Sequence, residues 1–541
     1  MRLFSLQSSR ASMLFARAGA ALAVAALVAG CGDNYRPVVN PINSNGPAPQ
    51  ATSYAVVVSS TGSTTPGVMT IIDYSGDAIM NETPIGPGPL VFTLDELGAT
   101  GYTVNSDGTL SNFSITTSLQ AKNVSESTLP PTARPVNLTA PSSGLWVTDL
   151  AGNVVDLFFG SPQAFKLAIP VATSASSATM PVFVAGAPTN GGEREYVLSQ
   201  NVPDTPAGQM TCNVSPKTAP TGVATPIELS SDTTDPAIPV GKCPVFGVQT
   251  PDLQRLFVLN RGDDTVTVIN SNKNTLDQCP VPLVTVPPST VPTCPPPYNT
   301  NQNGQPITFH PVLPLSTAAL TPANAPPNCN ITTNPTCGLG AIAGPVDAEY
   351  NAATQQLVVA NYDGGTISVI DVSLDEYGND SATFGTTYTI AVGNAATPDP
   401  ASVTVLADGS KAYSANQNDD GGTANGTVSV VNLSTHTLEK TLTVVGHPRQ
   451  IASTQNSEYS KIYVASPDSP FITIIQSSPT VTDLIDTTVL VEGTVVDMRT
   501  TTQNGSSGND NYSSRVPGYG QPCNLPGSAS LVSLAQCQAI P

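Results

Sequence analysis

Two short apolar segments flank a polar turn at several places along the chain, and this pattern recurs with small variations. From Gln355 to Val372 the sequence reads QQLVVANYDGGTISVIDV. Its first half is an apolar run that ends at an asparagine, and its second half alternates apolar and polar residues, as in a strand with one buried face. Similar phrases run from Arg255 to Asn270, from Lys411 to Asn432 and from Lys461 to Ile475. A unit of this kind cannot bury its own faces alone, so the repeat predicts the fold.

A further strand precedes each phrase and commonly opens with a proline. The opening prolines are Pro89, Pro135, Pro181, Pro244, Pro345, Pro400 and Pro448, and Gly493–Met498 resembles an opening strand without its proline. The second strands can be counted separately, at Tyr54–Val58, Gly101–Asn105, Leu145–Asp149, Glu195–Ser199, Leu256–Asn260, Leu357–Asn361, Lys411–Ala415 and Lys461–Ala465. Both counts give eight units, and short strands that repeat every roughly 40 to 50 residues indicate a β-propeller.

The two ends of the repeat region complement each other. The chain starts on a second strand near Tyr54 and ends on an opening strand near Val495, so placing both in one blade closes a ring. An open solenoid would expose strand edges and need capping units, which the sequence does not show. We therefore predict an all-β propeller of four-stranded blades, eight by count with seven as the alternative, closed by a C-terminal strand.

The phrases VVANYDGGTISVIDV, FVLNRGDDTVTVIN and YSANQ…GTVSVVN resemble the YVTN-type β-propeller repeat. The resemblance is good from about Pro244 to Gly493 and weaker from Tyr54 to Asn201. Members of this family commonly have seven blades. Related propellers include lactonases. The resemblance implies that such an enzyme would carry out its reaction at one mouth of the central channel, with polar and charged residues.

Composition agrees with a many-turned β protein, because only 5% of the residues are aromatic while 43 are Gly and 51 are Pro. The net charge of −20 argues against nucleic acid as a partner.

The N-terminus predicts export. Residues 1–17 carry three Arg and no acid, and the apolar run from Ala18 to Gly30 ends directly before Cys31. This resembles a bacterial lipoprotein signal, which implies lipidation of Cys31 and a membrane partner through that lipid. Gly32 rather than Asp follows, so the resemblance implies an outer-membrane location, periplasmic or surface-exposed.

The expected organisation follows from these segments. Residues 1–30 form the signal peptide and 31–52 a flexible tether rich in Pro, Asn and Ser. Residues 53–500 form the propeller, with insertions at about 201–241 and 279–340. Residues 501–541 form a tail with a small disulfide loop.

Eight cysteines remain once Cys31 is reserved for lipid, an even number that suits disulfides in an oxidising compartment. Pairs of sequence neighbours are expected among 105 possible pairings: Cys212 with Cys243, Cys279 with Cys294, Cys329 with Cys337, and Cys523 with Cys537.

In a propeller, the loops before the opening strands and after the second strands share one face. The first set of loops supplies Arg134, His447 and Arg449 as candidate residues of the channel mouth. The second set supplies Arg261, Asp263, Asp264, Tyr362, Asp363 and Asp419. His447 and Arg449 beside acids suit acid–base chemistry, but turn geometry also demands Asp, Asn and Gly at such positions.

No metal centre or cofactor is expected. The three histidines, His310, His436 and His447, are too scattered to ligate a metal together. The segments 418–422 (NDDGG) and 261–264 (RGDD) offer oxygens to Ca²⁺, but neither has the spacing of a calcium loop, so turn formation is favoured.

The sequence thus predicts a non-enzymatic binding or scaffolding module of the cell envelope, with an unnamed protein or small molecule as ligand and no assigned catalytic residue. Two alternatives stay open: a lactonase-like hydrolase that uses the channel mouth, and a surface adhesion or envelope structural protein. A convergent cluster of charged side chains at the mouth would favour the enzyme, whereas a mouth of Thr, Ser and backbone would not.

Overall fold

The computed structural model describes residues 53–501 apart from gaps at 96–97, 116–123, 141–143, 172–179, 187–193, 204–210, 213–214, 286–288, 290–291, 316–342, 396–397, 420–424, 455–459 and 478–482. The predicted signal peptide, lipidated Cys31, tether and C-terminal tail lie outside the described residues. So do two of the expected disulfides, Cys329–Cys337 and Cys523–Cys537. No helix within the described residues is long and apolar enough to span a membrane.

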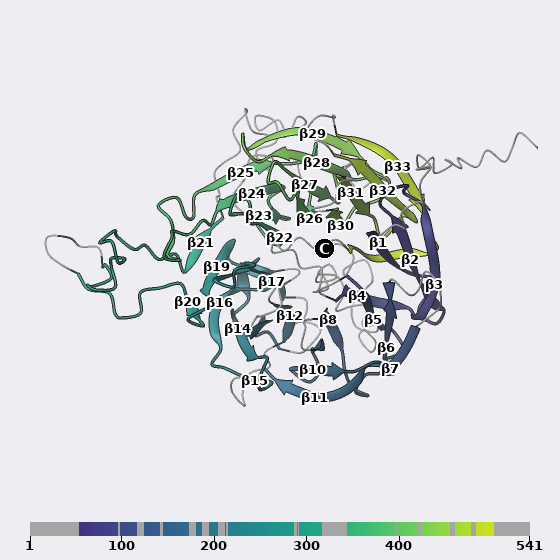
Figure 1. The fold of residues 1–541 in the computed structure, drawn as a ribbon, viewed down its shortest axis with the longest axis horizontal. Coiled ribbons are helices and arrows are strands. Elements are labelled where there is room, and N and C mark those ends of the chain that lie inside the picture. Colours follow the sequence, from purple (N-terminus) through teal and green to yellow (C-terminus); the bar gives the residue numbers. More distant parts are fainter. Residues whose placement is uncertain are drawn as a thin grey trace, which may run out of the picture. The chain divides into compact units, whose positions relative to one another are not determined.

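Eight antiparallel sheets, the blades, are arranged around one axis (Figure 1). From the outside inwards, blade 1 contains β3 (Ile79–Pro87), β2 (Pro66–Asp73), β1 (Tyr54–Ser60) and β34 (Thr494–Thr500); blade 2 contains β7 (Val124–Thr128), β6 (Thr109–Ser114), β5 (Thr100–Asn105) and β4 (Pro89–Leu94); blade 3 contains β11 (Ala164–Pro170), β10 (Val154–Phe159), β9 (Leu145–Asp149) and β8 (Pro135–Thr139).

Blades 4 and 5 each have an outer strand made of two pieces. Blade 4 contains β15 (Thr233–Thr234) and β16 (Ile238–Lys242) outside, then β14 (Thr221–Glu228), β13 (Arg194–Ser199) and β12 (Pro181–Ala185). Blade 5 contains β20 (Thr275–Leu276) and β21 (Val312–Pro314) outside, then β19 (Thr265–Asn270), β18 (Arg255–Asn260) and β17 (Pro244–Gln249).

The last three blades have the regular four strands. Blade 6 contains β25 (Thr387–Ala391), β24 (Thr366–Asp371), β23 (Gln356–Asn361) and β22 (Pro345–Asn351); blade 7 contains β29 (Thr437–Thr443), β28 (Thr427–Asn432), β27 (Lys411–Asn416) and β26 (Pro400–Val405); blade 8 contains β33 (Leu484–Leu490), β32 (Phe471–Gln476), β31 (Lys461–Ala465) and β30 (Gln450–Ser453). A short 3-10 helix, η1 (Pro216–Thr218), precedes β14.

The ring closes as the sequence predicts. The C-terminal strand β34 pairs with β1 at the N-terminal end of the propeller, and Tyr54 bonds to Thr501 across 447 residues. Each inner strand contacts the inner strand of the next blade, including β30 with β34 and β34 with β4. The prediction of an eight-bladed, all-β propeller closed by a C-terminal strand is confirmed.

The apolar runs become the second strands because both of their faces are covered by neighbouring blades. All five residues of β9, LWVTD, are buried, whereas β11, AFKLAIP at the outer edge, is mostly exposed. A strand buried on both faces needs apolar residues at successive positions, which is why these segments lack the alternation of a half-exposed strand.

The recurring asparagine at the end of the second strand has a structural role. In blade 6 the side-chain amide of Asn361 donates to the hydroxyls of Thr366 and Ser368, at 3.0 and 2.9 Å, across the turn to the third strand. The same pair of bonds is made by three more asparagines: Asn105 in blade 2, Asn260 in blade 5 and Asn416 in blade 7. The repeated polar residues therefore satisfy buried side chains at one end of blades 2, 5, 6 and 7.

The inner strands, which are the opening strands of the sequence pattern, have an edge that no further strand of the same blade covers. Side chains of the preceding blade accept hydrogen bonds from this edge: Val184 N–H donates to Asn137, Val403 to Asp347, Val405 to Glu349, and Ser453 to Thr404. These bonds satisfy buried amides that would otherwise be costly and join one blade to the next.

The segment 201–241, expected to be an insertion, contains strands β14 to β16 and completes blade 4. In blade 5 a true excursion, residues 277–311, leaves the ring between the two pieces of the outer strand (Figure 1).

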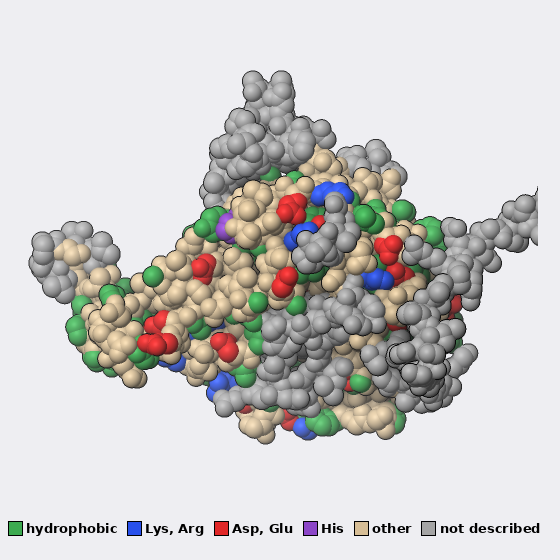
Figure 2. Space-filling model, turned by 45° about the horizontal axis from the view of Figure 1, so that its top comes forward, with side chains coloured by type: hydrophobic (Ala, Val, Ile, Leu, Met, Phe, Trp, Pro, Cys, Tyr) green, Lys and Arg blue, Asp and Glu red, His purple; other side chains and the backbone are tan. Residues whose placement is uncertain are grey.

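Figure 2 shows acidic and basic side chains scattered singly over one face of the described part rather than gathered into a patch of one sign.

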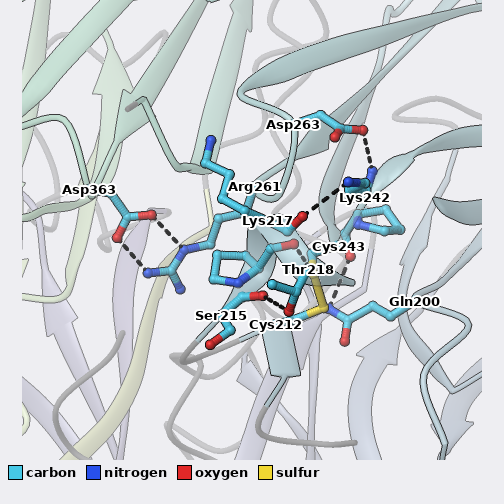
Figure 3. The surroundings of a disulfide bond; sticks show 12 residues. Gln200, Cys212, Ser215, Lys217, Thr218, Lys242, Cys243, Arg261, Asp263 and Asp363 are labelled. Carbon is cyan, nitrogen blue, oxygen red and sulfur yellow. Dashed lines mark hydrogen bonds and ion pairs between the residues drawn. A yellow bond between two sulfur atoms is a disulfide. The ribbon is translucent and has the colours of Figure 1, made fainter. Parts of the chain in front are cut away.

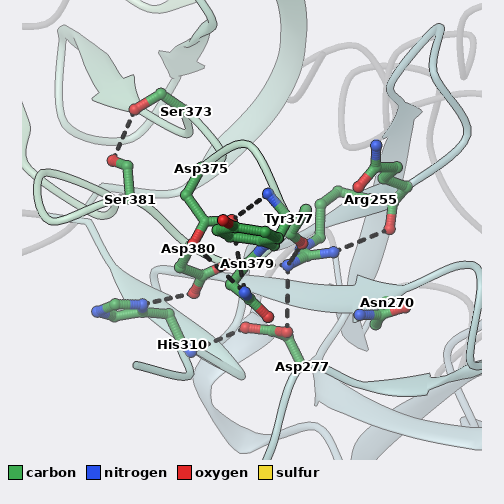
Figure 4. A network of polar contacts seen from close by, with 12 residues as sticks. Arg255, Asn270, Asp277, His310, Ser373, Asp375, Tyr377, Asn379, Asp380 and Ser381 are labelled. Atoms are coloured by element: carbon green, nitrogen blue, oxygen red, sulfur yellow. Dashed lines mark hydrogen bonds and ion pairs between the residues drawn. The ribbon is translucent and has the colours of Figure 1, made fainter. Parts of the chain in front are cut away.

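A buried network anchors this excursion (Figure 4). The guanidinium of Arg255 in β18 donates to Asp380 at 3.0 Å and lies 3.6 Å from Asp277. His310 of the excursion binds Asp380 through Nδ1 at 2.7 Å and Asp277 through its backbone N–H at 3.0 Å. Burial and the neighbouring Asp380 raise the pKa of Asp277 to about 6. The hydrogen bond to Asp380 raises the pKa of His310.

Candidate functional site

The loops that precede the inner strands and those that follow the second strands meet on one face, which we call the mouth face. Backbone hydrogen bonds join the two loop sets within each blade: Arg261 N–H donates to the Cys243 carbonyl, Tyr362 to Gly344, and Gln417 to Asp399. The turn residues predicted as mouth candidates therefore do lie on a common face.

The residue directly before the inner-strand proline has a left-handed conformation in five blades. Its φ is 53° at Gly88, 47° at Met180, 50° at Cys243, 60° at Gly344 and 52° at Asp399. Glycine adopts this conformation without strain, and among the other residues aspartate accepts it more readily than Met or Cys.

Arg261 and Asp363, which are 102 residues apart, form a bidentate ion pair between blades 5 and 6 (Figure 3). Nε and Nη2 of Arg261 donate to the two carboxylate oxygens of Asp363 at 3.0 and 2.8 Å. The Arg261 side chain is only 3% exposed, whereas that of Asp363 is 27% exposed. A Cβ on Gly344 would lie 1.9 Å from Asp363, so glycine at 344 makes room for the pair.

Asp399 of blade 7 adjoins this pair. Its carboxylate accepts a 2.6 Å hydrogen bond from the side-chain amide of Asn418 and lies beside the Tyr362 hydroxyl. Burial, opposed by the Asn418 hydrogen bond, raises the pKa of Asp399 to about 6, and the negative charge of Asp363 contributes to the rise. The Arg261 guanidinium lies over the ring of Tyr362, 5.5 Å from its centre.

Arg449 of blade 8 completes the cluster. The positive charge of Arg449 acts to lower the pKa of Tyr362, and burial lowers the pKa of the Arg449 guanidinium itself. Within the part of the chain that the structure describes, no hydrogen bond or ion pair of this guanidinium is found. A guanidinium that is partly buried without a carboxylate partner is a strong candidate for binding an anion or a developing negative charge.

The mouth cluster, as we call these residues, consists of Arg261, Tyr362, Asp363, Asp399, Asn418 and Arg449. It spans blades 5 to 8 and contains two carboxyl groups and two guanidinium groups around one tyrosine. Burial raises the pKa of Tyr362 well above its usual range, so its hydroxyl is protonated near neutral pH.

Other predicted mouth residues have roles in the loops. Asp263 accepts a 2.7 Å bond from the backbone N–H of Lys242, and the carboxylate of Asp264 accepts from Ala343 and Gly344. Asp419 accepts from the backbone of Asn394 and Ala395 and from Thr427.

Arg134 lies in blade 3. Its backbone N–H donates to the carboxylate of Asp149 at 2.6 Å.

His447 also lies on the mouth face, paired with Asp468. Its Nδ1 is 2.6 Å from one carboxylate oxygen and its backbone N–H donates to the other at 2.8 Å. Both members belong to blade 8. The acid beside His447 is therefore Asp468, while the proposed joint role of His447 and Arg449 stays a prediction.

Two of the expected disulfides are present. The bond between Cys212 and Cys243, the mouth disulfide, has a Cα–Cα distance of 5.5 Å and ties the segment around η1 to the loop before β17 (Figure 3). Lys217 of that segment pairs with Asp264. The bond between Cys279 and Cys294 closes a loop within the excursion, with a Cα–Cα distance of 5.7 Å.

The candidate Ca²⁺ segments gain no support from the geometry. The carboxylates of Asp263, Asp264 and Asp419 bind backbone amides, as turn-forming residues do. No group of three or more acidic, His or Cys residues suited to a metal occurs within the described ranges. Residues 420–424, part of one segment, lie outside them.

Asp399 and Asp468 were not predicted from the sequence, and Asn418 was considered only as part of the candidate Ca²⁺ segment 418–422. Asp399 stands before Pro400, at the position where Gly88 and Gly344 stand in other blades. An acid in place of the glycine that the backbone favours was the available signal.

No family model matches the chain, and no curated protein matches it. Similar solved structures do occur. A dihydro-heme d1 dehydrogenase, NirN, is 12% identical and has a TM-score of 0.52, with 86% of this chain and 77% of that chain covered. A periplasmic gluconolactonase of Pseudomonas aeruginosa is 13% identical, with a TM-score of 0.44 and coverage of 84% and 99%. AztD of Citrobacter koseri is 10% identical, with a TM-score of 0.48 and coverage of 84% and 99%. At these identities the likeness concerns the propeller fold alone.

Proposed function

We propose that this protein is a lactonase-like hydrolase whose reaction takes place at the mouth cluster. The observation that carries the proposal is Asp399, a half-buried carboxyl with a pKa of about 6 in the same cluster as two guanidinium groups. A general base works best when its pKa lies near the working pH, and active sites are where such shifts concentrate.

This proposal replaces the prediction of a non-enzymatic binding or scaffolding module. That prediction is contradicted by the comparison with solved propellers, which include a gluconolactonase. The convergent charges of the mouth cluster are also the feature that we expected of the enzyme and not of the module. These side chains are the basis for the proposed hydrolysis.

The proposed reaction uses the residues as follows. Asp399 accepts a proton from water as the water oxygen attacks the lactone carbonyl carbon. The guanidinium of Arg449 donates hydrogen bonds to the oxyanion that forms. When the intermediate collapses, the bond between the carbonyl carbon and the ring oxygen breaks, and the ring oxygen takes the proton from Asp399. The product is an open hydroxy acid.

The other members of the cluster position these two groups. Asn418 and Tyr362 hold the Asp399 carboxylate, and Asp363 fixes Arg261 against the Tyr362 ring. The charge of Arg261 also keeps the pKa of Asp399 from rising further.

The test is hydrolysis of a panel of five- and six-membered lactones, both sugar-derived and aliphatic. The release of protons measures the rate of hydrolysis. The wild-type chain should hydrolyse at least one member, and Asp399→Asn should lower kcat by roughly 100-fold or more, as expected for loss of a general base. Asp107→Asn is the matched control, because Asp107 is an exposed turn acid of blade 2 on the same face. A wild-type chain that is inactive on the whole panel, or an Asp399→Asn variant with full activity, would refute the proposal.

We also propose that the repeat is of the YVTN type and that the chain is exported and anchored through lipid on Cys31. The two disulfides support an oxidising compartment. Intact mass of membrane-extracted protein, with and without reductant, tests this. The predicted mass begins at Cys31 with acyl groups and rises on reduction, whereas a mass without acyl groups would contradict the anchor.

A further inference from the structure

The excursion of blade 5 contains a cavity of about 990 Å³, a volume usual for a site that binds a small organic molecule. Its lining residues are 278–283, 292–294, 299 and 306–311. None of these residues belongs to the mouth cluster, so the cavity is a separate candidate site.

Several cross-links hold the walls of this cavity in place. The disulfide between Cys279 and Cys294 joins two of the lining segments. Val284 and Thr293 exchange two backbone hydrogen bonds, each 2.8 Å long, and the N–H of Ile307 donates to the carbonyl of Asn299 at 2.9 Å. A ligand would therefore meet walls that are already ordered, which lowers the entropy cost of binding.

The lining is mostly apolar, because aliphatic and aromatic side chains join five prolines there. Among the described residues of the lining, none is Asp, Glu, Lys or Arg, and His310 is the only one that titrates near neutral pH. Leu283 is 55% exposed, and its neighbour Val284 is 39% exposed. Apolar side chains that face water in a concave wall favour a ligand that covers them, so the occupant should have an apolar body.

The ring of His310 offers one open edge to this cavity. Its Nδ1 is bonded to Asp380 at 2.7 Å, and the ring stacks on Phe384 with 5.2 Å between the ring centres. Its Cδ2 faces Gly385, where a Cβ would lie 3.7 Å away. The side chain is nevertheless 32% exposed. The open edge is therefore the one that carries Nε2, which points away from Asp380 in Figure 4.

The charges around His310 decide what Nε2 can bind. Asp380 and Asp277 face the ring, and the Arg255 guanidinium pairs with both carboxyl groups. The hydrogen bond to Asp380 raises the pKa of His310, so near pH 6 the ring is protonated and Nε2–H is a donor. At this pH two cations face one ionised and one half-protonated carboxyl group, so the network does not repel an anion. A carboxylate accepts a charge-assisted hydrogen bond from such a donor.

We infer that the cavity of the excursion binds an apolar carboxylic acid. Its carboxylate accepts a hydrogen bond from Nε2 of His310, and its hydrocarbon part covers the wall at Leu283. The inference does not depend on the proposed hydrolase activity, because the two sites share no residue.

The test is a saturation-transfer NMR titration of the full chain at pH 6 with octanoate and with octanamide, its uncharged analogue. Octanoate should bind, and octanamide should bind roughly three- to tenfold more weakly, the difference expected for one charge-assisted hydrogen bond at a partly exposed site.

Two variants separate the two parts of the site. In His310→Asn the side-chain amide can take the place of Nδ1 and keep the bond to Asp380, while Nε2 is lost, so octanoate should bind no better than octanamide. Leu283→Ser should weaken both probes about threefold, because it removes apolar surface that the hydrocarbon part covers.

Matched controls come from other blades. His436→Asn changes a turn histidine of blade 7 whose φ of 53° suits asparagine, and Leu484→Ser changes an exposed leucine of blade 8. Both control variants should bind octanoate as the wild type does.

Limited proteolysis within residues 277–311 checks that each variant keeps the excursion anchored, and if His310→Asn is cleaved faster than the wild type, Leu283→Ser decides alone. The inference is overturned if octanoate does not bind or if octanamide binds equally well. It is also overturned if octanoate binds but neither variant weakens it more than its control does, because the probe then binds elsewhere.

Discussion

Replacing Asp156 with asparagine should stabilise the propeller much more at pH 8 than at pH 5. Asp156 lies in β10 of blade 3 and is 1% exposed, and its Oδ2 has no hydrogen-bond partner among the described residues. It occupies the third position of the third strand, where Ser368 stands in blade 6. Asp149, at the end of β9, occupies the position of Asn361. Two acids thus replace the repeated amide and hydroxyl.

The magnitude follows from the shifted ionisation. Burial, with the nearby Asp149 as a second cause, raises the pKa of Asp156 from 3.8 to about 7. The folded chain therefore keeps a proton that the unfolded chain releases near pH 4, and the free energy of unfolding falls as the pH rises through this window. Ionisation against such a shift costs the folded state on the order of 4 kcal/mol above pH 7, of which roughly 2.5 kcal/mol is lost between pH 5 and pH 8.

Urea unfolding at pH 5 and pH 8 measures this difference, and Trp146 provides the signal. It is the one tryptophan of the chain, is fully buried in β9 and pairs across the strands with Leu157, next to Asp156. The Asp156→Asn variant lacks the ionisation, so its stability relative to the wild type should rise by roughly 2.5 kcal/mol between the two pH values.

Asp408→Asn is the control, because Asp408 is an exposed turn acid that binds the backbone of Ser410. It should change stability equally at both pH values. If the gain from Asp156→Asn is the same at pH 5 and pH 8, then Asp156 is ionised throughout, and our account of this acid pair is wrong.

Three further changes test the remaining contacts. Asp363→Asn leaves the buried Arg261 without its ion pair, so urea unfolding should show a loss of roughly 2 kcal/mol, and an unchanged midpoint would show that the pair is dispensable. Asp380→Asn removes the carboxylate that joins Arg255 to the excursion, so limited proteolysis within residues 277–311 should become faster; equal cleavage rates would contradict the anchoring role. Replacing both cysteines of the mouth disulfide with alanine opens a link between residues 31 apart and should cost about 3 to 4 kcal/mol in urea unfolding, and a cost near zero would contradict this estimate.

The sequence was informative where the pattern repeats. Apolar runs that end in asparagine located the second strands, because each such strand is covered on both faces and its asparagine bonds across the next turn. The repeats begin with a second strand near Tyr54 and end with an inner strand near Val495. This predicted ring closure, because the first blade lacks an inner strand of its own and the C-terminal strand supplies it. The pairs Cys212–Cys243 and Cys279–Cys294 followed from proximity in sequence.

The arrangement of the mouth cluster could not be obtained in this way. Arg261 and Asp363 meet because blades 5 and 6 are adjacent, although they are 102 residues apart in the sequence. Asp399 resembled an ordinary turn residue before proline, and only its place beside Asp363 and Tyr362 distinguishes it from Asp263, which binds backbone alone. Periodicity locates strands, but the partners of a turn residue depend on which blades are neighbours.

The pH dependence of kcat/KM for the best lactone tests the central claim most directly. Asp399 must be ionised to accept a proton from water, so kcat/KM should rise with pH through about 6 and level off above it. Asp399→Asn should abolish this rise and lower the plateau, while Asp107→Asn should leave both unchanged. A rise that persists unchanged in Asp399→Asn would show that another group is the base and would contradict the assignment of the mouth cluster as the active site.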